Sequence, residues 1–186
     1  MPADSLADLA REDSALTHPH PVCQEACALF VVALAKAISG GGGPEDVYRD
    51  TKRWAASSCR EDAVIRCLED AVSSPPEDYE KNQGWALVSL QNAFYQLLHA
   101  PTLEEGVVAT IMSGGDTDTN AAIAGARLGS VHGYDAIPRQ WRNMVLTCRP
   151  VATLAPTRHP RPYPFWPSDA LELAEKLLAI SSSAAS

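Results

Sequence analysis

The residues with the clearest potential for chemistry are two aspartates in the segment MSGGDTDTNAAIAG, residues 112–125. Asp116 and Asp118 follow two glycines and precede an alanine-rich run, and each is followed by a threonine. An aspartate ahead of a helix often accepts hydrogen bonds from the first free N–H groups, which is worth about 1 kcal/mol. Capping needs one oxygen, however, whereas this turn offers two carboxylates and the hydroxyls of Thr117 and Thr119. Hard oxygen donors of this kind suit Mg²⁺, Mn²⁺ or Ca²⁺.

Two further observations favour a metal site over a helix cap. Two carboxylates this close repel each other unless a cation lies between them. The glycines Gly114 and Gly115 can adopt backbone angles that aim the following side chains at one point. A calcium-binding EF-hand loop is excluded, because its sixth position, here Ala121, requires glycine and its twelfth, here Arg127, requires glutamate. We therefore predict that the turn binds a hard divalent cation.

A second group with metal-ligand residue types is formed by His18, His20, Cys23 and Cys27. The two cysteines would share one face of a helix, with the histidines just ahead of it. The order H-x-H-x₂-C-x₃-C matches no common zinc pattern, and cysteines on an apolar stripe usually pack in the core. A zinc site here remains the less favoured alternative.

Helices are expected to position these residues, because apolar side chains recur at helical spacing along most of the chain. No run alternates with a period of two between turn signals, so the sequence predicts an all-α fold, a compact multi-helix bundle. Residues 147–167, which are rich in proline, are predicted to be loop. The expected helices cover residues 22–38, 44–54, 60–72, 87–97, 102–111, 120–132 and a final segment that starts at Ser168.

The helix behind the GGDTDT turn is built from unusually small side chains. Ala121, Gly125 and Gly129 follow one another at four-residue spacing. Glycine inside a helix costs about 1 kcal/mol relative to alanine, so two of them usually mean that a neighbouring backbone comes close. We predict a buried central helix that presents its N-terminal turn to a site.

Composition limits the remaining classes of function. The 186-residue chain is long enough to form one domain over residues 1–186. A net charge of −8 with scattered basic residues argues against binding a nucleic-acid backbone. Apolar stretches such as 27–35 are shorter than a membrane span, and the N-terminus shows no secretory pattern. Five cysteines without a CxxC pair indicate reduced thiols, so we expect a cytoplasmic protein.

The sequence SGGDTDTNAAIAGARLGSVHG, followed by DAIPRQW, closely resembles the C-terminal part of the ADP-ribosylglycohydrolase family. The resemblance extends upstream through GWALVSLQNAFYQLLHAPTLEEGV to ALTHPHPVCQEACALF, and downstream to YPFWPSDALELAEKLL. It implies an all-α hydrolase that removes ADP-ribose from a modified side chain or small molecule. It also implies a binuclear centre of Mg²⁺ or Mn²⁺.

The resemblance assigns roles to the residues of the turn. Asp116, Asp118 and Thr119 match the second set of metal ligands in the family. The two aspartates are accordingly the candidate catalytic residues, since either can also orient the attacking water.

Four further residues are assigned to substrate binding. His18 matches a position near the substrate ribose, and Gly84 and Trp85 match a glycine–aromatic pair beside the pocket. Gly115 is placed on the substrate side of the metal turn. From the residues alone, His18 could equally be an exposed loop histidine, and Trp85 a plain core aromatic.

The chain departs from the family pattern in lacking the glycine-rich G-D segment and the Thr-Asp-Asp motif that supply the first metal ligands. We therefore expect a partial domain, with a partner chain that could supply the missing half. The substrate would be an ADP-ribosylated protein or a small ADP-ribose derivative. The alternative is a non-catalytic, regulatory remnant that binds ADP-ribose or metal without hydrolysis.

Overall fold

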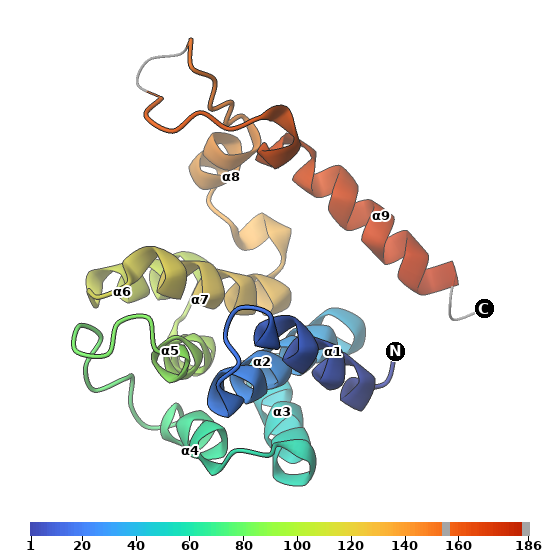
Figure 1. Cartoon of the computed structure of the whole chain (residues 1–186), viewed down its shortest axis with the longest axis vertical. Coiled ribbons are helices and arrows are strands. Elements are labelled where there is room, and N and C mark those ends of the chain that lie inside the picture. Colours follow the sequence, from blue (N-terminus) through green and yellow to red (C-terminus); the bar gives the residue numbers. More distant parts are fainter. Residues whose placement is uncertain (154–156, 184–186) are drawn as a thin grey trace. The chain divides into compact units, whose positions relative to one another are not determined.

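The computed structural model describes residues 1–153 and 157–183, and every regular element in these ranges is a helix (Figure 1). The predicted all-α class is thereby confirmed. The α-helices are α1 (Ala3–Ala15), α2 (Pro21–Gly40), α3 (Pro44–Ser58), α4 (Asp62–Asp70), α5 (Ala86–His99), α6 (Leu103–Met112), α7 (Thr117–His132), α8 (Arg139–Leu146) and α9 (Ala170–Ser183). The chain divides into two compact units, Met1–Ala136 and Ile137–Ser186, which we describe separately. That the whole chain forms one domain stays a prediction.

Helix α2 is the core helix of the first unit. It begins where His20 accepts a hydrogen bond through Nδ1 from the amide of Val22 at 3.2 Å, with Pro21 at the first helical position. It ends at Gly41, whose φ of +64° an L side chain rarely adopts. Between these ends, α2 contacts α1, α3, α5 and α7, and side chains such as Leu29 are fully buried.

Helix α2 is also longer and more apolar than the sequence pattern suggested. It has 20 residues with a mean hydropathy of 1.7 in its most apolar window, so by length and composition it could cross a membrane. The expectation that the apolar stretches are too short was therefore wrong for this helix. Half of that window is buried inside the protein, as in any core helix, so composition alone assigns no membrane role.

Helix α1 was not predicted, because its buried positions are Ala7, Arg11 and Ser14, which include no large apolar side chain. It is attached to α2 by a buried ion pair in which Nε of Arg11 lies 2.5 Å from Oε1 of Glu25. Burial alone would raise the pKa of the Glu25 carboxyl. Hydrogen bonds from the Arg11 guanidinium and from the backbone amide of Arg60 outweigh burial and lower that pKa below its ordinary value.

Helices α5, α6 and α7 pack together and carry the GGDTDT turn between α6 and α7 (Figure 1). Gly106 of α6 lies in a tightly packed part of this layer. A Cβ atom there would lie 2.6 Å from Cδ1 of Leu128 and 3.0 Å from the Cβ of Ala100. Small size at residue 106 is therefore what allows α6 to lie against α7.

The prediction that the glycines of α7 admit a neighbouring backbone was wrong. A Cβ at Gly125 or Gly129 would meet only the side chains of Val107 and Leu103, at 3.7 and 3.9 Å. Helix α7 is also buried on one face rather than all round, since Ala122 and the N-terminal residues near it are exposed. The small residues leave one face of α7 smooth and open.

The second unit contains α8, α9 and two short 3₁₀ helices, η2 (Tyr163–Phe165) and η3 (Pro167–Asp169). The predicted loop over 147–167 therefore contains one helical turn, and its residues 154–156 lie outside the described part of the chain. The guanidinium of Arg149 lies over the ring of Trp166, 5.6 Å from its centre. The indole of Trp166 donates to the carbonyl of Arg161 at 2.8 Å, so this segment folds onto itself.

Candidate functional site

The turn that leads into α7 is fixed by two consecutive glycines. Gly114 and Gly115 have φ values of +81° and +67°, as the sequence pattern suggested. A Cβ at Gly115 would lie 2.0 Å from the carbonyl oxygen of Tyr79, closer than any real contact. The turn thus requires glycine at this position both for its backbone angles and for space.

The side chain of Asp116 does not cap α7. Asp116 occupies the N-cap position with φ −80° and ψ 70°, and its carboxylate accepts no hydrogen bond from the helix. Its carbonyl accepts from the amide of Asn120 at 3.0 Å, so the backbone alone starts the helix. Asp118 lies exposed in the first turn. Within 1–153 and 157–183, neither carboxylate has an ion-pair or hydrogen-bond partner, so both keep their oxygens available to a ligand.

Beneath the turn lies a layer of buried polar side chains from α5, α6 and α7. Ser89 donates through Oγ to Oδ1 of Asn120 at 2.6 Å, and both are almost fully buried. Asn92 accepts from the hydroxyl of Tyr79 at 2.8 Å and donates to Oγ1 of Thr110 at 3.0 Å. These bonds join the segment that contacts Gly115 to the helices on either side of the turn. The turn is therefore mounted on a rigid base.

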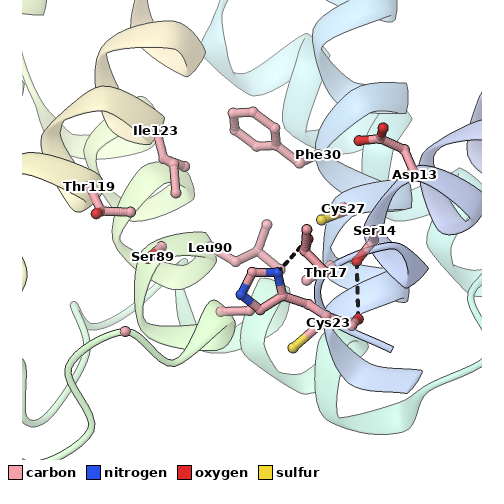
Figure 2. Close-up of a pocket in the computed structure, with 14 residues that line it drawn as sticks. Asp13, Ser14, Thr17, Cys23, Cys27, Phe30, Ser89, Leu90, Thr119 and Ile123 are labelled. Atoms are coloured by element: carbon pink, nitrogen blue, oxygen red, sulfur yellow. Dashed lines mark hydrogen bonds between the residues drawn. The ribbon is translucent and has the colours of Figure 1, made fainter. Parts of the chain in front are cut away.

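A cavity of 380 Å³ opens beside this base, within the first unit (Figure 2). Figure 2 shows Thr119 and Ile123 on one side of it and Thr17 and Cys23 on the opposite side, with Phe30 between them. The complete lining consists of Asp13, Ser14, Thr17, His18, Cys23, Ala26, Cys27, Phe30, Gly84, Ala86, Ser89, Leu90, Thr119 and Ile123. No Lys or Arg is among these lining residues, so the cavity itself offers no cation to an anionic ligand.

Three residues assigned from the sequence meet at this cavity. His18 comes from the link between α1 and α2, Gly84 from the segment before α5, and Thr119 from the first turn of α7. Nδ1 of His18 lies 2.9 Å from Oγ1 of Thr17, which leaves Nε2 as the second polar atom of the ring. Their convergence from distant parts of the chain is what a binding site requires.

Other assigned residues lie beside the cavity rather than on its wall. Trp85 lines a neighbouring hollow with Lys81 and Gln91. Its ring is half buried and meets the edge of His20, with 5.5 Å between the ring centres. Trp85 thus packs against His20 as a core aromatic would, and it also lines the neighbouring hollow. Asp116, Asp118 and Gly115 belong to the turn and are absent from the cavity wall.

One thiol at the cavity, that of Cys23, is poorly suited to nucleophilic chemistry. Burial raises the pKa of the Cys23 thiol, and the neighbouring Cys27 raises it further. A thiol with a raised pKa is less often the reactive thiolate at neutral pH. Cys23 therefore does not resemble the nucleophile of a cysteine-dependent hydrolase.

The donor set at the turn fits a hard cation. Two carboxylates without partners and a threonine hydroxyl are oxygen ligands of the type that Mg²⁺ and Mn²⁺ prefer, and the glycine turn holds them on a rigid base. Among the residues that the structure describes, no three His, Cys, Asp or Glu side chains gather closely enough to hold a metal ion. This finding contradicts the zinc alternative built on His18, His20, Cys23 and Cys27, and it also means that the turn offers a cation no more than two carboxylates.

Sequence reasoning missed the buried polar base, although a signal was present. Ser89, Asn92 and Gln96 follow one another at spacings of three and four in α5, and all three are buried. A polar stripe at helical spacing on a buried face indicates side chains that bond to a neighbouring element.

Comparison with known proteins identifies relatives of this chain. The sequence model of the ADP-ribosylglycohydrolase family matches residues 1–181. An ADP-ribosyl-[dinitrogen reductase] glycohydrolase of Rhodospirillum rubrum is 27% identical over 141 residues, which cover 75% of this chain and 43% of that protein. A protein of Acanthamoeba polyphaga mimivirus named as an ADP-ribosyl glycohydrolase is 36% identical over 150 residues, which cover 75% of this chain and 45% of that protein.

A solved structure gives the same relationship. A chain of an ADP-ribosylglycohydrolase-related protein complex superimposes with a TM-score of 0.64 at 27% sequence identity. The match covers 73% of this chain and 46% of the solved one. The chain thus spans less than half the length of each of these relatives.

Proposed function

Because the chain belongs to the ADP-ribosylglycohydrolase family, we propose that it takes part in hydrolysing the glycosidic bond between ADP-ribose and a modified side chain or small molecule. The observation that supports this most strongly is the meeting of His18, Gly84 and Thr119 at one cavity beside the GGDTDT turn. The Rhodospirillum rubrum relative is named after an ADP-ribosylated protein, dinitrogen reductase. That name favours an ADP-ribosylated protein as the substrate.

In this proposal, Asp116, Asp118 and Thr119 hold Mg²⁺ or Mn²⁺ through the oxygens that the structure leaves without partners. A divalent cation there supplies Lewis-acid stabilisation and a more acidic bound water. Asp116 or Asp118 orients the attacking water through a carboxylate oxygen. Bond cleavage at an anomeric carbon passes through an oxocarbenium-like transition state, which nearby carboxylates stabilise by their negative charge.

The cavity takes an uncharged ring of the substrate rather than its diphosphate. Its wall is mostly apolar, with the ring of Phe30 inside it and no lysine or arginine among its lining residues. His18 offers Nε2 to a ribose hydroxyl, and the backbone at Gly84 allows close approach because no side chain intervenes. Trp85 flanks the substrate from the adjacent groove.

The test is release of ADP-ribose from an ADP-ribosylated arginine substrate in the presence of Mg²⁺ or Mn²⁺. We expect metal-dependent release by the wild-type chain and a loss of at least about a hundredfold in Asp118→Asn, as for loss of a group that acts on the transition state. Glu12→Gln, which removes an exposed carboxylate of α1, is the matched control. Equal release by the wild type and Asp118→Asn would refute the catalytic role.

A second candidate function is binding of ADP-ribose or metal without hydrolysis. It is motivated by residues 1–186 themselves, which contain no Thr-Asp-Asp sequence and offer Asp116, Asp118 and Thr119 as their candidate metal ligands. It predicts that calorimetry detects ADP-ribose binding while no product is released. If a partner chain supplies the remaining ligands, hydrolysis should appear only when both chains are mixed. The cytoplasmic location and the absence of a membrane partner remain predictions.

A further inference from the structure

Asn120, the residue directly after Thr119, carries a buried amide group that is only half used. The side chain is 2% exposed, and its Oδ1 accepts from Ser89 at 2.6 Å. Its Nδ2 has no hydrogen-bond partner within the described residues. A buried donor left without an acceptor costs about 1–3 kcal/mol, and folded proteins retain few of them. Such a group calls for an acceptor that is present in the functional state.

The neighbouring Asn92 shows what a satisfied amide looks like in the same layer of helices. Its Oδ1 accepts from the hydroxyl of Tyr79 and its Nδ2 donates to Oγ1 of Thr110. Both asparagines are buried, and both are anchored between helices. Asn120 differs from Asn92 in that its Nδ2 has no hydrogen-bond acceptor among the described residues.

The nearest free acceptors along the chain belong to the turn itself. The amide N–H of Asn120 donates to the carbonyl of Asp116 at 3.0 Å, so the two residues are joined across the first turn of α7. The carboxylates of Asp116 and Asp118 have no hydrogen-bond partner among the described residues. An unused donor and unused acceptors therefore share one helical turn.

We propose that Asn120 is a positioning residue for the metal-binding turn. With a divalent cation bound at the turn, Nδ2 of Asn120 would donate to a carboxylate oxygen of Asp116, while Ser89 holds the amide through its hydrogen bond to Oδ1. Carboxylates that bind metals are usually hydrogen-bonded by such neighbours, and loss of the neighbour typically weakens metal binding about 10–100-fold. This inference rests on the proposed metal ligands.

Ser89 gives the arrangement a second consequence. Its side chain lies on the wall of the cavity, and its hydroxyl is the group that orients Asn120. A substrate in the cavity and a cation at the turn would thus be linked through one chain of three side chains, Ser89, Asn120 and Asp116.

The inference is tested by titrating the full chain with Mn²⁺ and following the free ion by electron paramagnetic resonance. The main variant is the double substitution Ser89→Ala with Asn120→Leu. It removes the hydroxyl and the amide together, so neither is left buried without its partner and folding should be nearly unaffected. We expect the dissociation constant for Mn²⁺ to rise about 10–100-fold.

Thr51→Val is the matched control. Thr51 is fully buried in α3, and its Oγ1 donates to the carbonyl of Val47 at 2.7 Å. Its loss removes a buried hydrogen bond away from the turn, so Mn²⁺ affinity should not change. Ser89→Ala alone provides a second variant, which should weaken Mn²⁺ binding by a smaller factor because the amide remains but loses its anchor.

The outcomes separate this inference from the proposed function. If the folded double variant binds Mn²⁺ as tightly as the wild type does, the proposed role of Asn120 is wrong, whatever the activity. The role is also wrong if the wild-type chain binds no Mn²⁺. If the double variant does not fold, unchanged affinity in Ser89→Ala overturns the role in its place. If the wild type binds Mn²⁺ and the variants bind it more weakly, but no ADP-ribose is released, the role of Asn120 stands and the hydrolytic proposal fails.

Discussion

Replacement of Gly115 by alanine tests whether the turn is as rigid as its geometry indicates. At a φ of +67° an L side chain costs about 1–2 kcal/mol. The new Cβ would also lie 2.0 Å from the carbonyl oxygen of Tyr79, which is backbone and cannot rotate away. The Tyr79 hydroxyl is in turn bonded to Asn92 at 2.8 Å, which holds the segment in place. Overpacking of this kind costs about 1–3 kcal/mol more.

We therefore expect Gly115→Ala to lower the free energy of unfolding by about 2–5 kcal/mol in urea titrations at 25 °C. Gly41→Ala is the control, because Gly41 has a φ of +64° but nothing within 4 Å of its added Cβ. Because Gly41 combines this φ with a ψ of −160°, its replacement should lose about 1–3 kcal/mol from backbone strain alone. Equal losses in the two variants would refute the contact with Tyr79 as a constraint on the turn.

Three further predictions concern buried ionisable groups. Arg127 is fully buried, its pKa is lowered to about 10 by burial, and no carboxylate among the described residues pairs with it. Arg127→Met should therefore leave the free energy of unfolding unchanged or raise it by about 1 kcal/mol in urea, whereas Arg11→Met, which strands the buried Glu25, should lower it by about 3–5 kcal/mol. The ion pair with Arg11 holds the pKa of Glu25 in the folded chain below its usual 4.5. The ion pair therefore stabilises the folded chain above pH 4.5, and this stabilisation is lost as the pH falls through the lowered pKa. Thermal melts between pH 6 and pH 3 should show a smaller loss of stability in Glu25→Gln than in the wild type. Burial raises the pKa of Cys67 to about 12, so iodoacetamide at pH 8 should label exposed Cys27 and leave Cys67 unlabelled in mass spectra of the native chain.

Each prediction in this group can be contradicted by a simple result. A large loss of stability in Arg127→Met would mean that the hydrogen bond from its guanidinium to Ser130, at 2.9 Å, and its contact with the Phe94 ring outweigh the cost of burying the charge. Parallel pH profiles for the wild type and Glu25→Gln would mean that the ion pair does not couple folding to protonation. Labelling of Cys67 at the rate of Cys27 would mean that α4 opens readily.

Helical spacing was enough to predict most of the first unit, because burial of one helix face repeats every three to four residues. Helix α7 begins three residues before the predicted start. Its backbone already closes a hydrogen bond from Asn120 to Asp116, so the motif residues themselves form the first turn. The helix predicted over 102–111 begins as expected, since Oγ1 of Thr102 accepts from the amide of Glu105 at 3.1 Å and caps α6. Helix α8 was missed even though Pro138 precedes it as a start signal.

Only the part of the candidate site that is formed by adjacent residues could be predicted from the sequence. The GGDTDT turn is a run of adjacent residues, so its chemistry can be read directly from the sequence. The bond between Ser89 and Asn120 joins residues 31 positions apart, and the contact at Gly115 depends on the path of a segment with no regular structure. Contacts of this kind are set by packing, which single-residue preferences do not encode.

The most direct test of the central claim is Mn²⁺ binding by the wild-type chain and by Asp116→Asn and Asp118→Asn, measured by calorimetry. If the GGDTDT turn holds a hard divalent cation, the wild type should bind the ion and each variant should bind it at least about tenfold more weakly, with unchanged thermal unfolding in the absence of metal. Binding of Mn²⁺ with the same affinity in all three chains would contradict the account.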